Sequence, residues 1–172
     1  MTRAIAIAAW ASGCVAEGPS ATDTSTFDPL HPCATPEMAV EAAPPHGDYG
    51  EFADGADLWC GNPPQGGAPY SPFKLRLSGP DEVGEGIAVE MTATDAATGE
   101  ELAYTTLTMG LTCANVGENA GHWVGSEAHL RYGGWTLDAL DGRLADVTIH
   151  AEAMADPSIA ADVSASVALV LD

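Results

Sequence analysis

The chain has 172 residues, of which 25 are acidic and five are Lys or Arg, so its formal net charge at pH 7 is −20. A charge of this sign and size repels phosphate backbones and anionic lipid surfaces, which argues strongly against nucleic acid as a partner. The length suits one domain, and beyond the N-terminal region no stretch approaches the ~18 consecutive apolar residues of a membrane span.

The N-terminal region has the order of an export signal that is removed. Arg3 precedes a short apolar run at residues 4–11, which leads through small residues to Cys14. The residues Ala11-Ser12-Gly13-Cys14 resemble the lipobox of bacterial lipoproteins, although Ala11 stands where that class prefers leucine. The resemblance implies cleavage before Cys14, a diacylglycerol on its sulfur and, usually, a third acyl chain on its new amino group.

We therefore expect an export signal at residues 1–13 and a mature protein in the bacterial cell envelope, anchored to the membrane through lipid on Cys14. The alternative location is secreted or periplasmic and soluble. The alternative structure is a first strand or buried helical turn at residues 4–11, with Cys14 in a disulfide.

Residues 14–32 are rich in Ser, Thr, Asp, Gly and Pro and predict a flexible tether. Pro and Gly also recur between residues 33 and 72, which predicts an irregular segment with one helical turn at 36–43, capped by Thr35. This segment has too many aromatic side chains for a pure linker, so we expect it to pack onto the strands after residue 72. Residues 33–172 are predicted to form a single domain.

From Phe73 onward apolar residues recur with a period of two, which is typical of half-buried antiparallel strands. These runs and the turn signals between them predict an all-β fold, an antiparallel β-sandwich of about seven strands, immunoglobulin-like or related. A closed antiparallel barrel is the alternative. The predicted strands lie near residues 73–77, 87–94, 102–109, 122–132, 135–140, 147–153 and 163–171.

Two hairpins are predicted. In the first, Gly99 supplies the positive φ for a loop at residues 95–100. In the second, a three-residue loop around Asp141-Gly142 would place Asp138 and Asp146 roughly opposite each other. Asp138, Asp141 and Asp146 are therefore a candidate site for Ca²⁺, the one cofactor that the sequence suggests. Their spacing matches no EF-hand loop, and a solvated hairpin end is the favoured alternative.

The densest group of polar side chains lies between Cys113 and the next predicted strand. A loop with amides, an acid and small residues is the kind of segment that binds ligands at the edge of a sandwich, and its alternative is a structural turn. A carbohydrate ligand would also use the rings of Tyr132 and Trp135, although core packing is the default for such rings. The candidate ligand-binding residues are Asn115, Glu118, Asn119, His122 and Trp123.

The cysteines of this chain do not all pair if Cys14 is lipidated, because three then remain. We predict a disulfide between Cys60 and Cys113, which would join the irregular segment to the end of a core strand, with Cys33 left over. Chain entropy does not choose the partner of Cys60, since the two candidate loops differ by only about 0.5 kcal/mol.

No catalytic motif stands out, and the catalytic residues are unknown. His122, His129 and His150 lack the spacing of zinc or copper sites, and Glu127, His129 and Arg131 fit an ordinary charge network on one side of a strand. We expect a binding or structural protein of the envelope, whose partner is another envelope protein or a carbohydrate. The alternative is a secreted hydrolase or metal-dependent enzyme whose site the sequence does not reveal.

Overall fold

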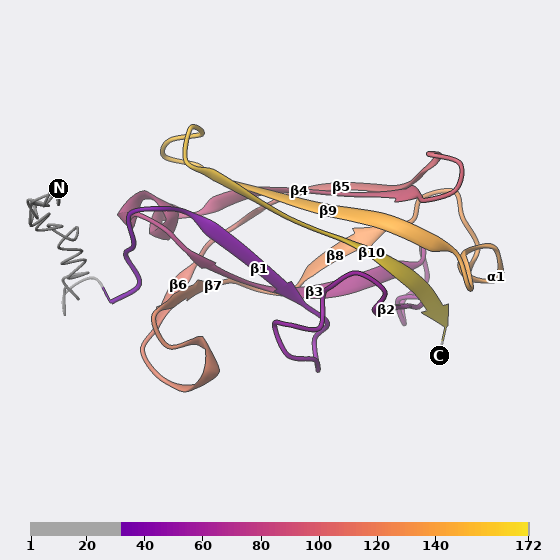
Figure 1. Ribbon diagram of the computed structural model, residues 1–172, viewed down its shortest axis with the longest axis horizontal. Coiled ribbons are helices and arrows are strands. Elements are labelled where there is room, and N and C mark those ends of the chain that lie inside the picture. Colours follow the sequence, from indigo (N-terminus) through magenta and orange to yellow (C-terminus); the bar gives the residue numbers. More distant parts are fainter. Residues whose placement is uncertain (1–31, 172) are drawn as a thin grey trace, which may run out of the picture.

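The computed structural model describes residues 32–171, in which two five-stranded sheets face each other as a β-sandwich (Figure 1). The predicted export signal, the Cys14 lipidation site and almost all of the predicted tether lie outside the described residues. The strands are β1 (Ala39–Ala43), β2 (Asp57–Cys60), β3 (Tyr70–Ser78), β4 (Ile87–Asp95), β5 (Glu101–Met109), β6 (Thr112–Ala114), β7 (His122–Val124), β8 (Ala128–Arg131), β9 (Leu144–Ala153) and β10 (Ala160–Leu171), with 3-10 turns η1 (Asp81–Glu85) and η2 (Gly117–Asn119) and one helical turn, α1 (Leu137–Leu140).

One sheet, the β3 sheet, has the order β1-β3-β7-β6, and β8 also pairs with β3. The other, the β9 sheet, has the order β2-β10-β9-β4-β5. All neighbouring strands are antiparallel except β2 and β10, which are parallel. The sandwich prediction is confirmed, and the described residues do not close into the alternative barrel.

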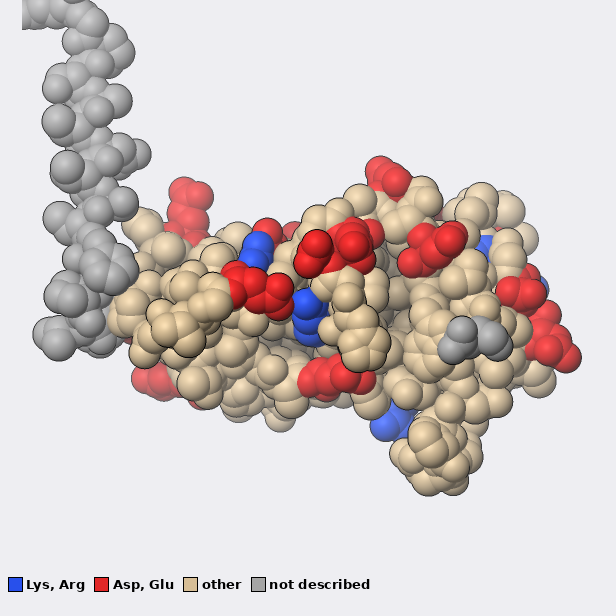
Figure 2. Space-filling view, turned by 90° about the horizontal axis from the view of Figure 1, so that it is seen from below, with Lys and Arg blue, Asp and Glu red and all other residues tan. Residues whose placement is uncertain are grey.

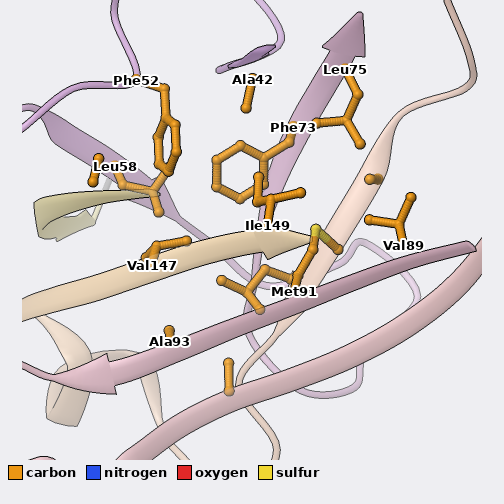
Figure 3. Close-up of a cluster of buried hydrophobic side chains, with 14 of the residues drawn as sticks. Ala42, Phe52, Leu58, Phe73, Leu75, Val89, Met91, Ala93, Val147 and Ile149 are labelled. Carbon is orange, nitrogen blue, oxygen red and sulfur yellow. The ribbon is translucent and has the colours of Figure 1, made fainter. Parts of the chain in front are cut away.

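The core lies between the sheets because alternate residues of each strand face inward. Phe73 and Leu75 of β3 are fully buried and meet Met91 and Ile149 of the opposite sheet (Figure 3). Phe52, from the segment before β2, packs edge-on against Phe73 with 5.4 Å between ring centroids. The expectation that the proline-rich segment packs onto the sandwich is therefore confirmed.

That segment is more regular than predicted. It contains β1 and β2, and the expected helical turn at residues 36–43 is wrong. Val40 and Ala42 alternate with Glu41, and they pair with Leu77 and Leu75 along the edge of β3. Hydrogen bonding to an existing strand and burial of alternate residues outweigh the local helix signal.

The hairpin at residues 95–100 is confirmed. Gly99 has φ +73°, and the carboxylate Oδ1 of Asp95 accepts hydrogen bonds from the amides of Ala97 and Thr98 at 3.0 and 2.9 Å. The other carboxylate oxygen of Asp95 pairs with Arg143 at 2.8 Å. These hydrogen bonds, above all the one from the Thr98 amide, lower the pKa of Asp95.

The second predicted hairpin is wrong. Residues 135–140 do not form a strand: Leu137–Leu140 form a single helical turn, and the amide of Gly142 donates to Leu169 of β10 at 2.8 Å. Burial of Leu140 fixes this turn against the core. The predicted strand at 122–132 is interrupted between β7 and β8, where Gly125 lies so close to Met109 that a Cβ atom would overlap the Met109 side chain.

The disulfide joins Cys33 to Cys113, with 5.7 Å between their Cα atoms, and the predicted Cys60–Cys113 pairing is wrong. Cys60 lies on β2, which belongs to the β9 sheet, whereas Cys113 lies on β6 at the edge of the β3 sheet. The amide of Thr35 donates to Gly79 after β3 at 2.8 Å, and this contact brings the chain at Cys33 to the same end of the sandwich as β6. Cys60 is a free, fully buried thiol.

Candidate functional site

The predicted ligand-binding loop folds over the outer face of the β3 sheet. The carboxylate of Glu118 pairs with Lys74 at 3.3 Å, and its backbone carbonyl accepts a hydrogen bond from Arg76 at 3.0 Å. Arg76 also pairs with Glu41 and lies over the ring of Tyr49, 4.1 Å from its centroid. The hydrogen bond from Arg76 lowers the pKa of Glu41. The polar groups of Glu118 are thus engaged in holding the loop to β3.

The other four predicted residues of this loop do not converge. His122 faces outward, with Nδ1 3.3 Å from the carbonyl of Ala120, whereas Trp123 is on the inner face and packs against Gly84. The side-chain oxygen of Asn119 is buried and unpartnered among the described residues, and Asn115 is exposed. A ligand-binding role for these residues stays a prediction.

The aromatic residues proposed for carbohydrate binding also lie apart. Tyr132 is fully buried, with its hydroxyl 2.9 Å from the hydroxyl of Ser71. Trp135 lies beneath the guanidinium of Arg143, at 4.5 Å, near the helical turn α1. Trp123, Tyr132 and Trp135 therefore form no common platform.

The predicted metal ligands are not gathered either. Within residues 32–171 no group of three or more His, Cys, Asp or Glu side chains is placed to hold a metal ion. Asp138, Asp141 and Asp146 are all exposed, and Asp146 accepts a hydrogen bond from Ser166. His150 pairs with Asp162 at 2.7 Å on the β9 sheet, away from His122 and His129 on the β3 sheet.

The structure instead brings three rings into a row on the outer surface, where β2, β3 and β8 meet. The ring of Tyr70 contacts both others: Trp59 is perpendicular to it at 5.8 Å between centroids, and the centroid of His129 lies 4.7 Å away, with the two rings tilted by 47°. We call this row, with the depressions beside it, the Tyr70 groove. Trp59 and Tyr70 come from the segment that was predicted to be irregular. His129 comes from the predicted strand on which Glu127, His129 and Arg131 were interpreted as an ordinary charge network.

Backbone contacts fix these rings from several sides. Gly61 and Tyr70 exchange two hydrogen bonds, of 3.1 and 2.9 Å, and close the loop between β2 and β3. The amide of Tyr132 donates to Pro69 at 2.9 Å. The indole of Trp59 covers Gly61 so closely that a Cβ atom there would overlap the ring, so only glycine permits this position of the indole. The groove is therefore held by main-chain contacts as well as by side-chain packing.

Two depressions adjoin Tyr70, and its ring lines both. The first has a volume of about 520 Å³ and is mostly apolar; the second has a volume of about 370 Å³ and lies under the loop before β3. Volumes of this order suit small ligands such as one or two sugar rings. The first is lined by Pro44, Pro45, His46, Trp59, Tyr70, Pro72 and Glu127, and the second by Pro63, Pro64, Gln65, Gly66, Gly67, Ala68, Tyr70, His129 and Arg131.

Few charged side chains lie around the groove, and they differ in whether they form an ion pair. Glu127 pairs with His129 at 2.8 Å. Lys74, Arg76 and Arg143 each form an ion pair, but the guanidinium of Arg131 forms none within the described part of the chain. Figure 2 views the molecule from the side of the β3 sheet and shows its few Lys and Arg groups set among Asp and Glu. Arg131 is thus the cationic side chain of the groove that forms no ion pair with another described residue.

No nucleophile adjoins the groove histidine. In residues 32–171 no histidine is hydrogen-bonded to a Ser, Thr or Cys side chain, and Nε2 of His129 is already bound by Glu127. The free thiol of Cys60 is fully buried, and burial raises its pKa to about 11, so it is protonated at neutral pH. No histidine of the described residues is thus placed to activate a Ser, Thr or Cys nucleophile.

No protein-family model matches the sequence, and no curated protein matches it either. Among the described residues no helix is long and apolar enough to cross a membrane. What the groove can bind is therefore inferred from its own geometry.

Sequence reasoning missed Trp59 and Tyr70 as site residues. The available signal was the density of aromatic residues in a proline-rich segment, which indicated packing but not which rings stay at the surface. Their proximity depends on the hydrogen-bonded contact between Gly61 and Tyr70, and no local pattern of residues 59–70 marks that contact.

Proposed function

We propose that this protein is an exported, lipid-anchored binding protein of the bacterial cell envelope and that it binds carbohydrate in the Tyr70 groove. The observation that carries the proposal is the row of Trp59, Tyr70 and His129 between two depressions. Sugar rings present C–H groups to the electron-rich faces of aromatic rings and hydroxyls to neighbouring polar groups. An apolar surface with a few polar groups at its rim meets both requirements.

The cysteines support the lipid anchor. Cys33 and Cys113 are paired with each other, and Cys60 is enclosed in the core. None of the three therefore needs Cys14 as a disulfide partner. The odd number of cysteines that remains after lipidation of Cys14 is thus no argument against the lipid anchor. A disulfide is also typical of proteins outside the cytoplasm.

The position of the disulfide supports binding away from the membrane. Cys33 is held near the Ser78 end of β3, whereas the groove lies at the Tyr70 end, and the two ends are about 25 Å apart at the usual rise of a strand. Cys33 lies 19 positions after Cys14, a stretch that spans at most about 65 Å. A lipid on Cys14 would leave the groove free to meet envelope polysaccharide.

Two experiments test the two parts separately. For the anchor, the chain is expressed in a bacterial host and the membrane fraction is analysed by intact mass. The expected product begins at Cys14 with added acyl chains, and Cys14→Ser is expected to abolish them. A product that retains residues 1–13, or a soluble wild-type protein that Cys14→Ser leaves unchanged, would contradict the anchor.

For binding, the domain is titrated with a panel of neutral and charged oligosaccharides, with tryptophan fluorescence and calorimetry as readouts. Tyr70→Ala is expected to weaken binding at least about tenfold, because the central ring is lost. Tyr49→Ala is the matched control: Tyr49 is half-buried, lies against Lys74 and Arg76 on the same sheet, and lines none of the depressions around Tyr70 and His129. Absence of binding to every saccharide, or equal losses in both variants, would contradict the carbohydrate proposal.

A further inference from the structure

Among the Lys and Arg side chains of residues 32–171, Arg131 is the one without an ion-pair partner, although the protein is strongly acidic. The other three Lys or Arg side chains of the described residues are held in ion pairs with Glu118, Glu41 and Asp95. The backbone of Arg131 is nevertheless fixed, because its amide donates to Thr105 at 3.0 Å and its Cα is in register with Tyr70. Its guanidinium is thus available to a ligand, from a well-placed strand position.

Arg131 lines two depressions, and the one beside Tyr70 is free of carboxylates, whereas the other, of about 470 Å³, also contains Glu127. The chain contains 25 acidic residues, yet the lining of the smaller depression contains none. It offers the guanidinium of Arg131, the imidazole of His129 and the amide of Gln65 around the ring of Tyr70. A guanidinium binds a carboxylate through two parallel hydrogen bonds, and that pairing is stronger than one with a neutral hydroxyl.

We propose that the smaller depression binds the carboxylate of an acidic sugar, a uronic acid unit of a polysaccharide, through Arg131 while the sugar ring stacks on Tyr70. This inference rests on the proposed carbohydrate-binding function and narrows its ligand class. Stacking and ion pairing come from adjacent strands, since Tyr70 begins β3 and Arg131 ends β8. One pyranose ring with a carboxylate at its edge can meet both groups.

The net charge of the protein does not prevent this binding. Solvent-exposed charges are largely screened beyond about 8 Å at physiological ionic strength. The carboxylate of Glu127 is hydrogen-bonded to His129 at 2.8 Å; it lines the larger depression and a third one that Arg131 also lines, but not this one. Local attraction by Arg131 therefore decides which sugar is preferred.

The test compares two ligands of equal length that differ at one position of each ring: trigalacturonate, with a carboxylate, and galactotriose, with a hydroxymethyl group. Both are titrated into the full chain and into three variants, Arg131→Ala, Lys74→Ala and Tyr70→Ala. Lys74→Ala is the matched control, because it removes the same charge from the same sheet outside the groove. The fold of each variant is checked by circular dichroism and thermal unfolding.

The wild-type protein is expected to bind trigalacturonate about tenfold more tightly than galactotriose. Arg131→Ala is expected to remove this preference and Lys74→Ala to keep it. Equal affinity of the wild type for both ligands, with binding lost in Tyr70→Ala, would overturn the acidic-sugar inference and leave the carbohydrate proposal standing. Absence of binding to either ligand would overturn the inference, and with the saccharide panel also negative it would overturn the carbohydrate proposal.

An Arg131-dependent preference for a peptide with a free C-terminal carboxylate, such as trialanine, over its amide would also overturn the inference if trigalacturonate does not bind. That outcome would show that the groove binds the C-terminal carboxylate of a peptide.

Discussion

The hydroxyls of Ser71 and Tyr132 lie 2.9 Å apart in the core, directly behind the Tyr70 groove. Ser71 follows Tyr70 on β3 and Tyr132 follows Arg131 after β8, so this one buried hydrogen bond joins the two strand ends that carry the site. Burial raises the pKa of Tyr132 and keeps its hydroxyl protonated. A polar contact in the interior thus helps to hold the two strand ends that carry Tyr70 and Arg131.

Tyr132→Phe is expected to destabilise the protein by about 1–2 kcal/mol, since the hydroxyl of Ser71 loses a partner in a buried position. For a domain of this size the melting temperature should fall by about 3–8 °C. Tyr104→Phe is the control, because its hydroxyl donates to Glu90 on the exposed surface and its loss should change stability by less than about 0.5 kcal/mol. Equal shifts in the two variants would contradict a stabilising role for the buried contact.

Cys33→Ser and Cys113→Ser are each expected to lower the free energy of unfolding by about 2–5 kcal/mol, because the bridge closes a loop of 80 residues. Urea unfolding measures the change, and the two variants should agree with each other and with the reduced wild-type protein. Peptide mapping without reduction should recover the Cys33–Cys113 pair. Recovery of Cys60 in a disulfide-linked peptide would contradict the assignment.

The free thiol of Cys60 is expected to make the free energy of unfolding depend on pH in the alkaline range. Its pKa is raised to about 11 in the folded protein, against 9.0 for an ordinary thiol, chiefly by burial. The unfolded chain therefore loses this proton first, so the stabilising contribution is complete below pH 9 and declines as the pH rises toward 11. Cys60→Ala is expected to show a smaller fall in the free energy of unfolding between pH 8.5 and 10.5, measured by urea unfolding with the disulfide intact. An unchanged pH dependence would contradict the raised pKa.

Gly61→Ala is expected to displace Trp59, because the new methyl group would overlap the indole ring. Tryptophan fluorescence should shift, and affinity for any saccharide bound in the groove should fall with it. Gly110→Ala is a suitable control, since a Cβ atom there meets nothing within 4 Å. Unchanged fluorescence in Gly61→Ala would contradict the displacement of the indole, and shifted fluorescence with unchanged affinity would show that the indole position does not matter for binding.

The sequence predicts the parts of this fold that depend on short-range alternation. The strands around Val89, Val147 and Val167 and the hairpin at Gly99 follow from period-two burial and from one residue with positive φ. β1 was missed because its pattern is short and its stability comes from pairing with β3. The turn at residues 137–140 was missed because its alternating pattern is equally compatible with a strand.

The site was less predictable than the fold. Polar density drew attention to the segment after Cys113, where Glu118 in fact holds the loop to Lys74 and Arg76. The groove depends on contacts between Trp59, Tyr70 and His129, which come from three different strands. Which of these rings remain at the surface is decided by tertiary packing, and a single sequence does not encode that in any local pattern.

The parallel pairing of β2 with β10 sets an order of events for this chain. Asp57–Cys60 align with residues 168–171, so the strand that carries Trp59 has no sheet to join until more than a hundred further residues have been made. The Trp59 side of the groove therefore depends on residues more than a hundred positions further along the chain, whereas the pairing of β3 with β8 brings Tyr70 and His129 together.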